Sequence, residues 1–272
     1  MSHLRNALAL LMGAFITTTM TQCSAPTAQK DLVVKNYFAE KDYDPEDYVD
    51  YGVFVDYPVS GPSPLVDSIC AAICNVIFLH NEAPTPTIPA GTDLTPVLNR
   101  ELNAFVQHAR KANAELRKEM PDYFPHYSFR HSISLTDNNE RYVTYYFSGD
   151  YNEGGAHGNP WEYGMSFDRT TGSAIQWDDI LTPSGLKAFN DLVYQKIIAE
   201  YFAADGLEPW CKPSEMLLHA HPCSALTTEG IKVHYAPYSI GPYSIGTPYC
   251  TIPYGVVQTL LTPYGKKLIF GT

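Results

Sequence analysis

The chain has 272 residues, and its 18 Lys and Arg against 29 Asp and Glu give a formal net charge of −11. Nucleic acids and anionic lipids attract clustered Lys and Arg, so this acidity argues against both as direct ligands. Hydrophobic residues make up 45% of the chain and charged residues 17%, a composition typical of globular rather than disordered proteins.

Residues 1–22 have the pattern of an export signal, and Cys23 follows them directly. Arg5 supplies a basic start, residues 7–16 form an apolar segment too short to span a bilayer, and residues 17–22 are polar. We therefore expect a signal peptide at 1–22 and lipidation of Cys23. The expected location is the cell envelope, on the periplasmic side of the outer membrane. The alternative is an ordinary signal peptide, because the residues before Cys23 depart from the usual lipoprotein pattern.

The next segment is strongly acidic. Residues 31–56 hold eight acidic residues against Lys35 and Lys41, a net charge of −6, with tyrosines between them. Its carboxylates do not follow a calcium loop, because the sixth position is Asp47 rather than Gly. We expect a linker and acidic segment at 23–49, which would either attract a basic protein or simply be solvated.

The periodicity of apolar residues then predicts a mixture of helices and strands in chain order. The expected elements are a strand at 51–57, helices at 64–79 and 95–120, strands at 128–135, 141–151, 162–167 and 174–177, a helix at 182–201, strands at 231–235 and 249–252, and a short helix at 256–261. This order predicts the α+β class, an antiparallel sheet with packed helices. We expect an N-terminal domain at 50–150 and a C-terminal domain at 151–272.

The five cysteines after Cys23 are expected to be in an oxidising compartment, where disulfides form. Cys211 and Cys223 flank a loop and are the best candidates for a disulfide. Cys70 and Cys74 lie four residues apart on an expected helix and would bridge only with strain.

Three motifs in the C-terminal half resemble a known family. They are GGAHGN at 154–159, WDDIL at 177–181, and TEGI at 228–231 followed by the tyrosine-rich stretch 235–246. Their order is similar to the domain of unknown function shared by RsiV-type anti-sigma factors and PdaC-type peptidoglycan deacetylases, here in a stand-alone form. The resemblance implies a two-part module outside the membrane and near peptidoglycan, which in the RsiV type senses lysozyme. The motifs of the separate PdaC catalytic domain are absent from the sequence.

The glycine-rich motif at 154–159 is the sharpest candidate site. Its glycines allow tight turns, so His157 and the neighbouring Asn159 could face a ligand. His157 could also act with Asp150 or Glu153 in acid–base chemistry. The alternative is a tight connection between strands in which His157 is bonded to local backbone.

A second candidate is the stretch 235–246, in which Pro-Tyr-Ser-Ile-Gly occurs twice. Tyr235, Tyr238 and Tyr243 could stack on sugars or anchor a protein interface, or they could pack on the sheet. His219, His221, Cys211 and Cys223 contain zinc-type ligand atoms, but the spacing is unusual and export favours a disulfide instead.

These features predict a non-enzymatic envelope lipoprotein that binds a peptidoglycan fragment or a cationic, lysozyme-like protein. We assign no catalytic residue, no metal and no cofactor, and the predicted ligand-binding residues are His157, Asn159, Tyr235, Tyr238 and Tyr243. One alternative is a hydrolase of cell-wall sugar that uses His157 and a nearby carboxylate. Another is a purely structural envelope protein.

Overall fold

The computed structural model describes residues 31–45, 48–77, 88–89, 91–123 and 125–272. The predicted signal peptide and the predicted lipidation site at Cys23 lie outside the described residues. Among the helices that the structure describes, none is long and apolar enough to cross a membrane.

The first part of the molecule is a five-stranded sheet in the order β1-β2-β3-β4-β5. All its neighbouring strands are antiparallel except β2 and β3, which are parallel. The strands are β1 (Val33–Asp44), β2 (Val49–Ser60), β3 (Tyr127–Asn138), β4 (Tyr142–Glu153) and β5 (Asn159–Asp168).

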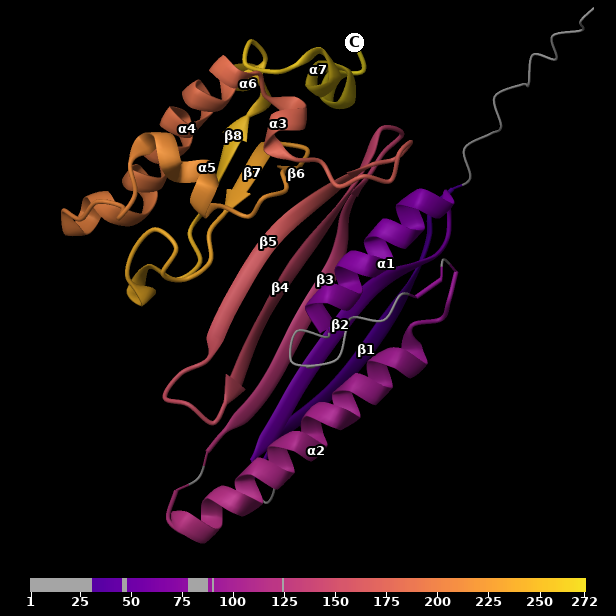
Figure 1. The fold of residues 1–272 in the computed structure, drawn as a ribbon, viewed down its shortest axis with the longest axis vertical. Helices are drawn as coiled ribbons and strands as arrows, with labels where there is room; N and C mark the ends of the chain where they lie inside the picture. The colour runs from indigo at the N-terminus through magenta and orange to yellow at the C-terminus, as the bar shows by residue number, and fades with distance from the viewer. Residues whose placement is uncertain (1–30, 46–47, 78–87, 90, 124) are drawn as a thin grey trace, which may run out of the picture.

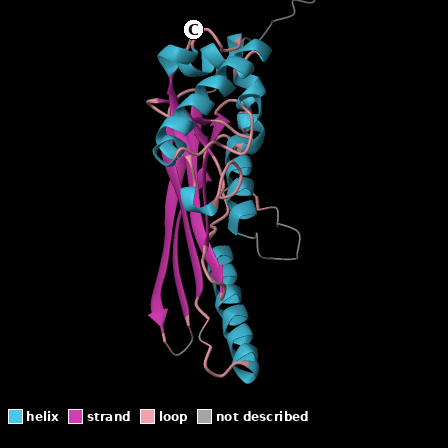
Figure 2. Cartoon of the chain, turned by 90° about the vertical axis from the view of Figure 1, so that its left-hand side faces the viewer, coloured by secondary structure: helices cyan, strands magenta, loops and turns pink. Residues whose placement is uncertain are grey.

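Two helices, α1 (Ser63–Ile77) and α2 (Thr95–Glu119), connect the parallel strands β2 and β3. A parallel pair needs such a long crossover, because a tight turn reverses the chain. Both helices lie along one face of the sheet (Figure 1), and from the side the long helix α2 runs beside the thin layer of strands (Figure 2).

The first hydrophobic core lies between this face and the helices. Along β3, Phe129 and Ile133 are buried toward the helices, while Arg130 and Ser132 are exposed on the opposite face. This alternation follows from the two-residue period of a strand. Two tyrosine hydroxyls attach α2 and its start to the sheet: Tyr37 donates to Asn99 Oδ1 at 2.8 Å, and Tyr57 donates to Asp93 Oδ1 at 2.7 Å.

The second part is a three-stranded sheet in the order β6-β7-β8, packed with short helices around a second core. Its strands are β6 (Ala225–Leu226), β7 (Gly230–His234) and β8 (Tyr249–Pro253). Its α-helices are α3 (Trp177–Ile180), α4 (Pro183–Ile197), α5 (Met216–His219), α6 (Tyr254–Val257) and α7 (Pro263–Phe270). The other helical turns are η1 (Ile198–Phe202), η2 (Ala203–Asp205), η3 (Pro213–Glu215) and η4 (Tyr243–Ile245).

The two parts meet at the β4–β5 side of the large sheet, on the face away from α1 and α2. Thr144 Oγ1 lies 2.7 Å from Ser166 Oγ and donates to the Leu226 carbonyl at 2.7 Å. Gly164 allows β6 to approach closely, because a Cβ at that position would lie 2.4 Å from the Cβ of Ala225. The two sheets are therefore held in contact by a small polar cluster and by one glycine.

The α+β class predicted from the sequence is confirmed, as are the strands that flank the turn at 139. The helices expected at 64–79 and 95–120 correspond to α1 and α2, and residues 78–79 of the first lie outside the described residues. The predicted strand at 174–177 is wrong. Ala174 and Gln176 make only isolated bridges, to Phe167 and Cys223 respectively, and the α3 helix begins at Trp177. The final helix, α7, was not among the expected elements.

The predicted division of the chain differs from the structure in two places. The segment expected as an acidic linker contains β1, an edge strand whose charged side chains are largely exposed while Tyr37 is buried. The large sheet also crosses the expected boundary at residue 150, because β4 continues to Glu153 and pairs with β5. Antiparallel pairing across a turn keeps these strands in one sheet.

The predicted disulfide between Cys211 and Cys223 is absent. All five cysteines in the described part of the chain are buried free thiols. Cys211 Sγ contacts Met216 Sδ at 3.5 Å, whereas Cys223 Sγ accepts a hydrogen bond from Gln176 Nε2 at 3.1 Å. Because the two sulfurs contact different neighbours, packing rather than a disulfide stabilises the loop between them.

Candidate functional site

The turn between β4 and β5 presents His157 to solvent. Gly154 begins this turn with a φ of +84°, a conformation that glycine adopts without strain. His157 Nδ1 lies 2.8 Å from the carbonyl oxygen of Gly158. Because a carbonyl only accepts, Nδ1 carries the hydrogen, and the imidazole is fixed by its own backbone.

Two tyrosines from the C-terminal part continue the surface that begins at His157. Tyr243 donates its hydroxyl to the same Gly158 carbonyl at 2.9 Å, and its ring centroid lies 4.4 Å from that of His157. The Tyr238 ring lies 5.5 Å further on, tilted by 35° from Tyr243. We call these three rings, His157, Tyr243 and Tyr238, the aromatic ledge.

Tyr238 occupies a backbone position that normally suits glycine. Its φ is +67°, and the backbone N–H of Ser239 donates to the Ala236 carbonyl at 3.2 Å across the turn. With Pro237 second and a positive φ third, this matches a type II turn, in which Gly or Asn is usual at the third position. The ring is nevertheless 54% exposed, so it does not compensate for this strain by full burial.

The other predicted ligand-binding residues lie in different places. Asn159 is the exposed first residue of β5, two positions after His157 in the chain. Tyr235 is 0% exposed and belongs to the second core, where burial raises the pKa of its phenol. The structure therefore brings together His157, Tyr238 and Tyr243, and it places Tyr235 away from the ledge.

The geometry at His157 does not assemble an acid–base pair. Neither Asp150 nor Glu153 lies within ion-pair distance of its imidazole in the described part of the chain, and its Nδ1 is bonded to backbone. Asp150 instead packs against Gly158, where a Cβ would lie 2.4 Å from its Oδ1. The arrangement suits holding a ligand better than transferring a proton.

The histidines and cysteines near residue 220 do not form a metal site. His219 is exposed, and His221 stacks on Tyr163 with ring centroids 3.9 Å apart. No group of three or more potential ligands converges among the residues that the structure describes. A tetrahedral zinc site needs four, or three with a water.

Apart from the two histidines at 219 and 221, a cavity between the two parts is lined by residues that the sequence did not single out. Trp161, Glu162 and Tyr163 of β5 meet His221 and His234 there. The one signal available in the sequence was a polar His234 at the end of an apolar strand, and nothing linked it to β5 about 70 positions earlier.

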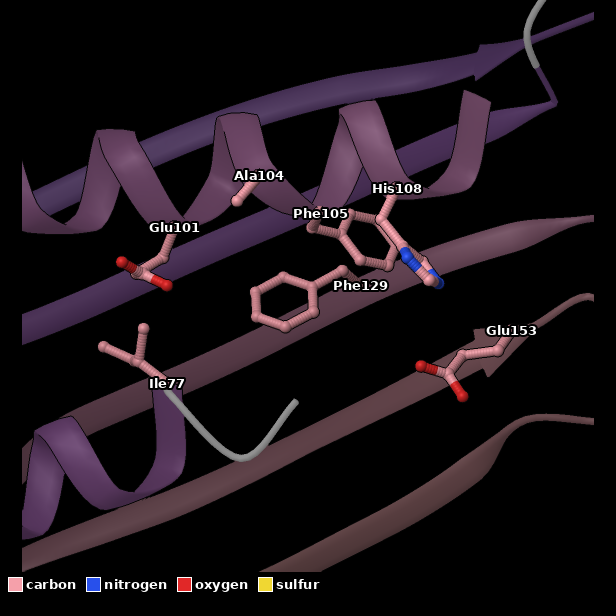
Figure 3. A pocket seen from close by; sticks show the side chains of 7 residues that line it. All are labelled: Ile77, Glu101, Ala104, Phe105, His108, Phe129 and Glu153. Atoms are coloured by element: carbon pink, nitrogen blue, oxygen red, sulfur yellow. The ribbon is translucent and has the colours of Figure 1, made fainter. Parts of the chain in front are cut away.

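A smaller cavity of about 180 Å³ lies between α2 and the large sheet (Figure 3). Phe105 and Phe129 face each other in it, with Glu101 at one end and His108 and Glu153 at the other. Among the described residues, its lining joins apolar side chains to two carboxylates and one exposed histidine without a buried, unpaired polar atom that would indicate a ligand, so we assign it none.

Comparisons with known proteins found two matching family models and similar solved structures. A family model described as deacetylase PdaC matches residues 79–160, and one described as a protein of unknown function, DUF3298, matches residues 178–255. No curated protein matches the chain.

Two solved structures of the DUF3298 family are similar to the chain. That of a Bacteroides fragilis member has a TM-score of 0.62 at 17% identity, over 90% of this chain and 98% of the other. That of a Pseudomonas aeruginosa member has a TM-score of 0.43 at 19% identity, over 86% of this chain and 94% of the other. At this identity the Bacteroides structure shows a shared fold and says nothing about a ligand.

Proposed function

The chain is a module of the PdaC/DUF3298 type, and from that premise we propose that it is a binding protein of the cell envelope. Its proposed ligand is the glycan of peptidoglycan, and its proposed site is the aromatic ledge. The likeness to the deacetylase PdaC supports a wall-associated role by analogy only, since one fold can serve many functions. The proposed location is outside the cytoplasm, with the chain anchored through a lipid on Cys23.

The observation that carries the proposal is the strained and exposed Tyr238 beside two neighbouring rings, those of Tyr243 and His157. A tyrosine in a turn position that suits glycine costs stability, and such strain is retained where a side chain has a role. Aromatic rings offer flat apolar faces, and the C–H faces of a sugar ring pack on them while its hydroxyls find polar partners. Asp150 and Asn159 lie beside the ledge as such partners.

Binding of soluble muropeptides, measured by isothermal titration calorimetry, tests this function. We expect the wild-type protein to bind and His157→Ala to bind about fivefold to tenfold more weakly, because one aromatic contact is worth about 1 kcal/mol. His108→Ala, which removes an exposed histidine on the opposite side of the sheet, is the matched control and should leave affinity unchanged.

A parallel titration with a c-type lysozyme separates the glycan from a cationic protein partner. If muropeptides do not bind and lysozyme binds with strong salt dependence, the glycan proposal is wrong and the acidic surface is the better explanation. That surface is smaller than the sequence suggests. Asp50 is buried and paired with Arg130, and Asp56 accepts a hydrogen bond from the Leu135 N–H.

A further inference from the structure

A cavity of about 430 Å³ is lined by residues of β5, by His234 at the end of β7 and by the segment 219–221. The ribbon in Figure 1 shows β5 and β7 as neighbouring strands of the two parts. The volume of the cavity falls within the range of about 300–1,000 Å³ that is typical of small-molecule sites. Val76 at the end of α1, Ala220 and Ala236 supply apolar walls. The remaining walls are polar or aromatic.

His234 is the most unusual residue in this cavity. Its side chain is 2% exposed, and within the described residues neither ring nitrogen makes a hydrogen bond. Nδ1 lies 3.8 Å from Glu162 Oε1, a distance too long for a hydrogen bond. Burial lowers the pKa of His234, so the ring is neutral and offers one donor and one acceptor. Leaving a buried donor and acceptor unpaired is unfavourable, so a ligand that pairs them gains from doing so.

His221 offers a second donor with a defined direction. Its Nδ1 accepts a hydrogen bond from the Cys223 N–H at 3.3 Å, and burial lowers its pKa to about 4. A neutral imidazole whose Nδ1 accepts must carry its hydrogen on Nε2. The ring is held flat on Tyr163, with 5° between the planes, so it cannot turn the Nε2–H away without losing this stack.

Glu162 supplies the acceptor. Its Oε2 accepts the Tyr146 hydroxyl at 2.5 Å. Burial raises the pKa of this carboxyl, but its neighbours His234, Tyr146 and Lys232 lower it, and the net shift is downward. The group is therefore a carboxylate at neutral pH, and it disfavours anionic ligands in the cavity.

The backbone of Glu162 also faces the free edge of β5. Ser166, four residues later, uses its N–H for the Ser224 carbonyl at 2.9 Å and its carbonyl for the Ile175 N–H at 2.8 Å, both away from β4. Backbone groups that point away from the neighbouring strand recur at every second residue of an antiparallel strand. The N–H and carbonyl of Glu162 therefore also point away from β4. Within the described chain no partner meets them there.

We infer that this cavity binds the acylamino group of an N-acylated amino sugar. Such a group is uncharged and has an N–H for the carboxylate or the carbonyl of Glu162. It also has a carbonyl oxygen for the imidazole N–H groups, and a methyl group for the apolar walls. The inference rests on the proposed glycan-binding function and adds a second contact to it. The aromatic ledge would bind the flat faces of the sugar rings in the glycan, and the cavity would bind the acylamino substituent of one of those sugars.

The test is a titration of the ¹⁵N-histidine-labelled protein with N-acetylglucosamine, followed through the imidazole signals. We expect the His234 and His221 signals to move and to saturate, and glucose, which lacks the acylamino group, to move them at least tenfold less at equal concentration. Ala236→Trp fills the mouth of the cavity and should abolish these shifts. Ala204→Trp, an equally large change at an exposed site on η2, should preserve them.

The same spectra separate the two proposals. If only the His157 signal moves, the sugar binds on the ledge alone, and the cavity inference is wrong while the proposed function stands. If the His234 signal moves and the His157 signal does not, the ledge is wrong. If neither moves, both are wrong, and equal shifts with glucose overturn the assignment of the acylamino group.

Discussion

The roles that we propose for the histidines differ because the histidines differ in burial. His157 is exposed and bonded to its own backbone, so it is available to a ligand from outside. His221 and His234 line an enclosed cavity, where burial favours the neutral ring and lowers the pKa of both. Burial of this kind depends on two strands brought together from distant parts of the chain.

The lowered pKa of His221 makes stability depend on pH. In the unfolded chain the imidazole takes up a proton near pH 6.5, whereas the folded chain does so only at about pH 4. The unfolded state thus binds more protons between these values, and the free energy of unfolding should fall by about 2–3 kcal/mol as pH drops from 6.5 to 4. Above pH 6.5 this contribution is fully present.

Urea denaturation between pH 4 and 7.5 measures this dependence. His221→Phe keeps a ring on Tyr163 without a titratable group, so its slope should be shallower than that of the wild type. His108→Phe, at an exposed position, should keep the wild-type slope. An unchanged slope in His221→Phe would show that other groups set the acid sensitivity.

The low reactivity that we expect of the cysteines also follows from their burial. Burial raises the pKa of the Cys70 thiol to about 12, of Cys74 to about 11 and of Cys250 to about 12, so little thiolate exists near neutral pH. We expect the native protein to resist iodoacetamide. After unfolding without reductant, mass spectrometry should find Cys211 and Cys223 both alkylated. A peptide that carries a Cys211–Cys223 disulfide would contradict the structure.

At the scale of the elements, the sequence pattern predicted those elements whose formation depends mainly on interactions between residues close together in the chain. The helix expected at 182–201 begins where an N-cap forms locally, because Thr182 Oγ1 accepts the Gly185 N–H at 3.0 Å. The long helices were predictable from their apolar spacing. The strand β1 was not, because its charged residues resemble a linker, and only its pairing with β2 makes it a strand.

The turn after β5 shows that the conformation at the end of a strand can depend on a contact with a distant part of the chain. Gly172 has a φ of +76°, and a Cβ there would lie 2.3 Å from the Pro64 carbonyl carbon at the start of α1. Gly172→Ala should therefore destabilise the protein by more than the usual 1 kcal/mol or so for a strained φ. Gly206→Ala is the matched control, since Gly206 has a φ of +63° with open space around it.

Thermal or urea unfolding of the two glycine variants measures the difference. We expect Gly172→Ala to cost at least about 2 kcal/mol more than Gly206→Ala, because backbone atoms must shift. If the two variants lose the same free energy of unfolding, the turn at Gly172 can move away from α1 without loss of stability, and the prediction is wrong.

At the scale of the whole molecule, two hydrophobic cores are joined by a small polar cluster. Thr144, Ser166 and the Leu226 backbone form consecutive hydrogen bonds across the contact, and Arg141 reaches the last helix through the Leu268 carbonyl at 2.7 Å. The cavity around His234 exists only because the two parts are held in this arrangement. The family resemblance predicted a two-part module, but no pattern within either part predicted the cavity between them.

Thr144→Val tests this coupling. The change keeps the shape of the side chain and leaves the Leu226 carbonyl without its hydroxyl donor, so it should cost about 1–3 kcal/mol. Thr228→Val, at an exposed position in the turn before β7, should cost less than about 1 kcal/mol. Urea unfolding followed by tryptophan fluorescence measures both, and equal costs would argue against the cluster as the joint.

The sequence predicted part of the candidate site, and the reason is physical. His157, Tyr238 and Tyr243 lie in glycine- and proline-rich turns whose composition indicates exposed loops. Tyr235 has the same local pattern but is the residue directly after β7, and it is buried. Residues such as Glu162 and His234 give no local signal, because their roles come from packing between two sheets.

The central claim is that the aromatic ledge binds glycan and that Tyr238 keeps a strained backbone for this purpose. The most direct test is Tyr238→Gly, measured for both unfolding free energy and muropeptide affinity. Glycine relieves the positive φ, so we expect stability to stay equal or to rise by up to about 1 kcal/mol. We expect affinity to fall at least tenfold in the same variant, because the ring is lost. Unchanged affinity would contradict the account.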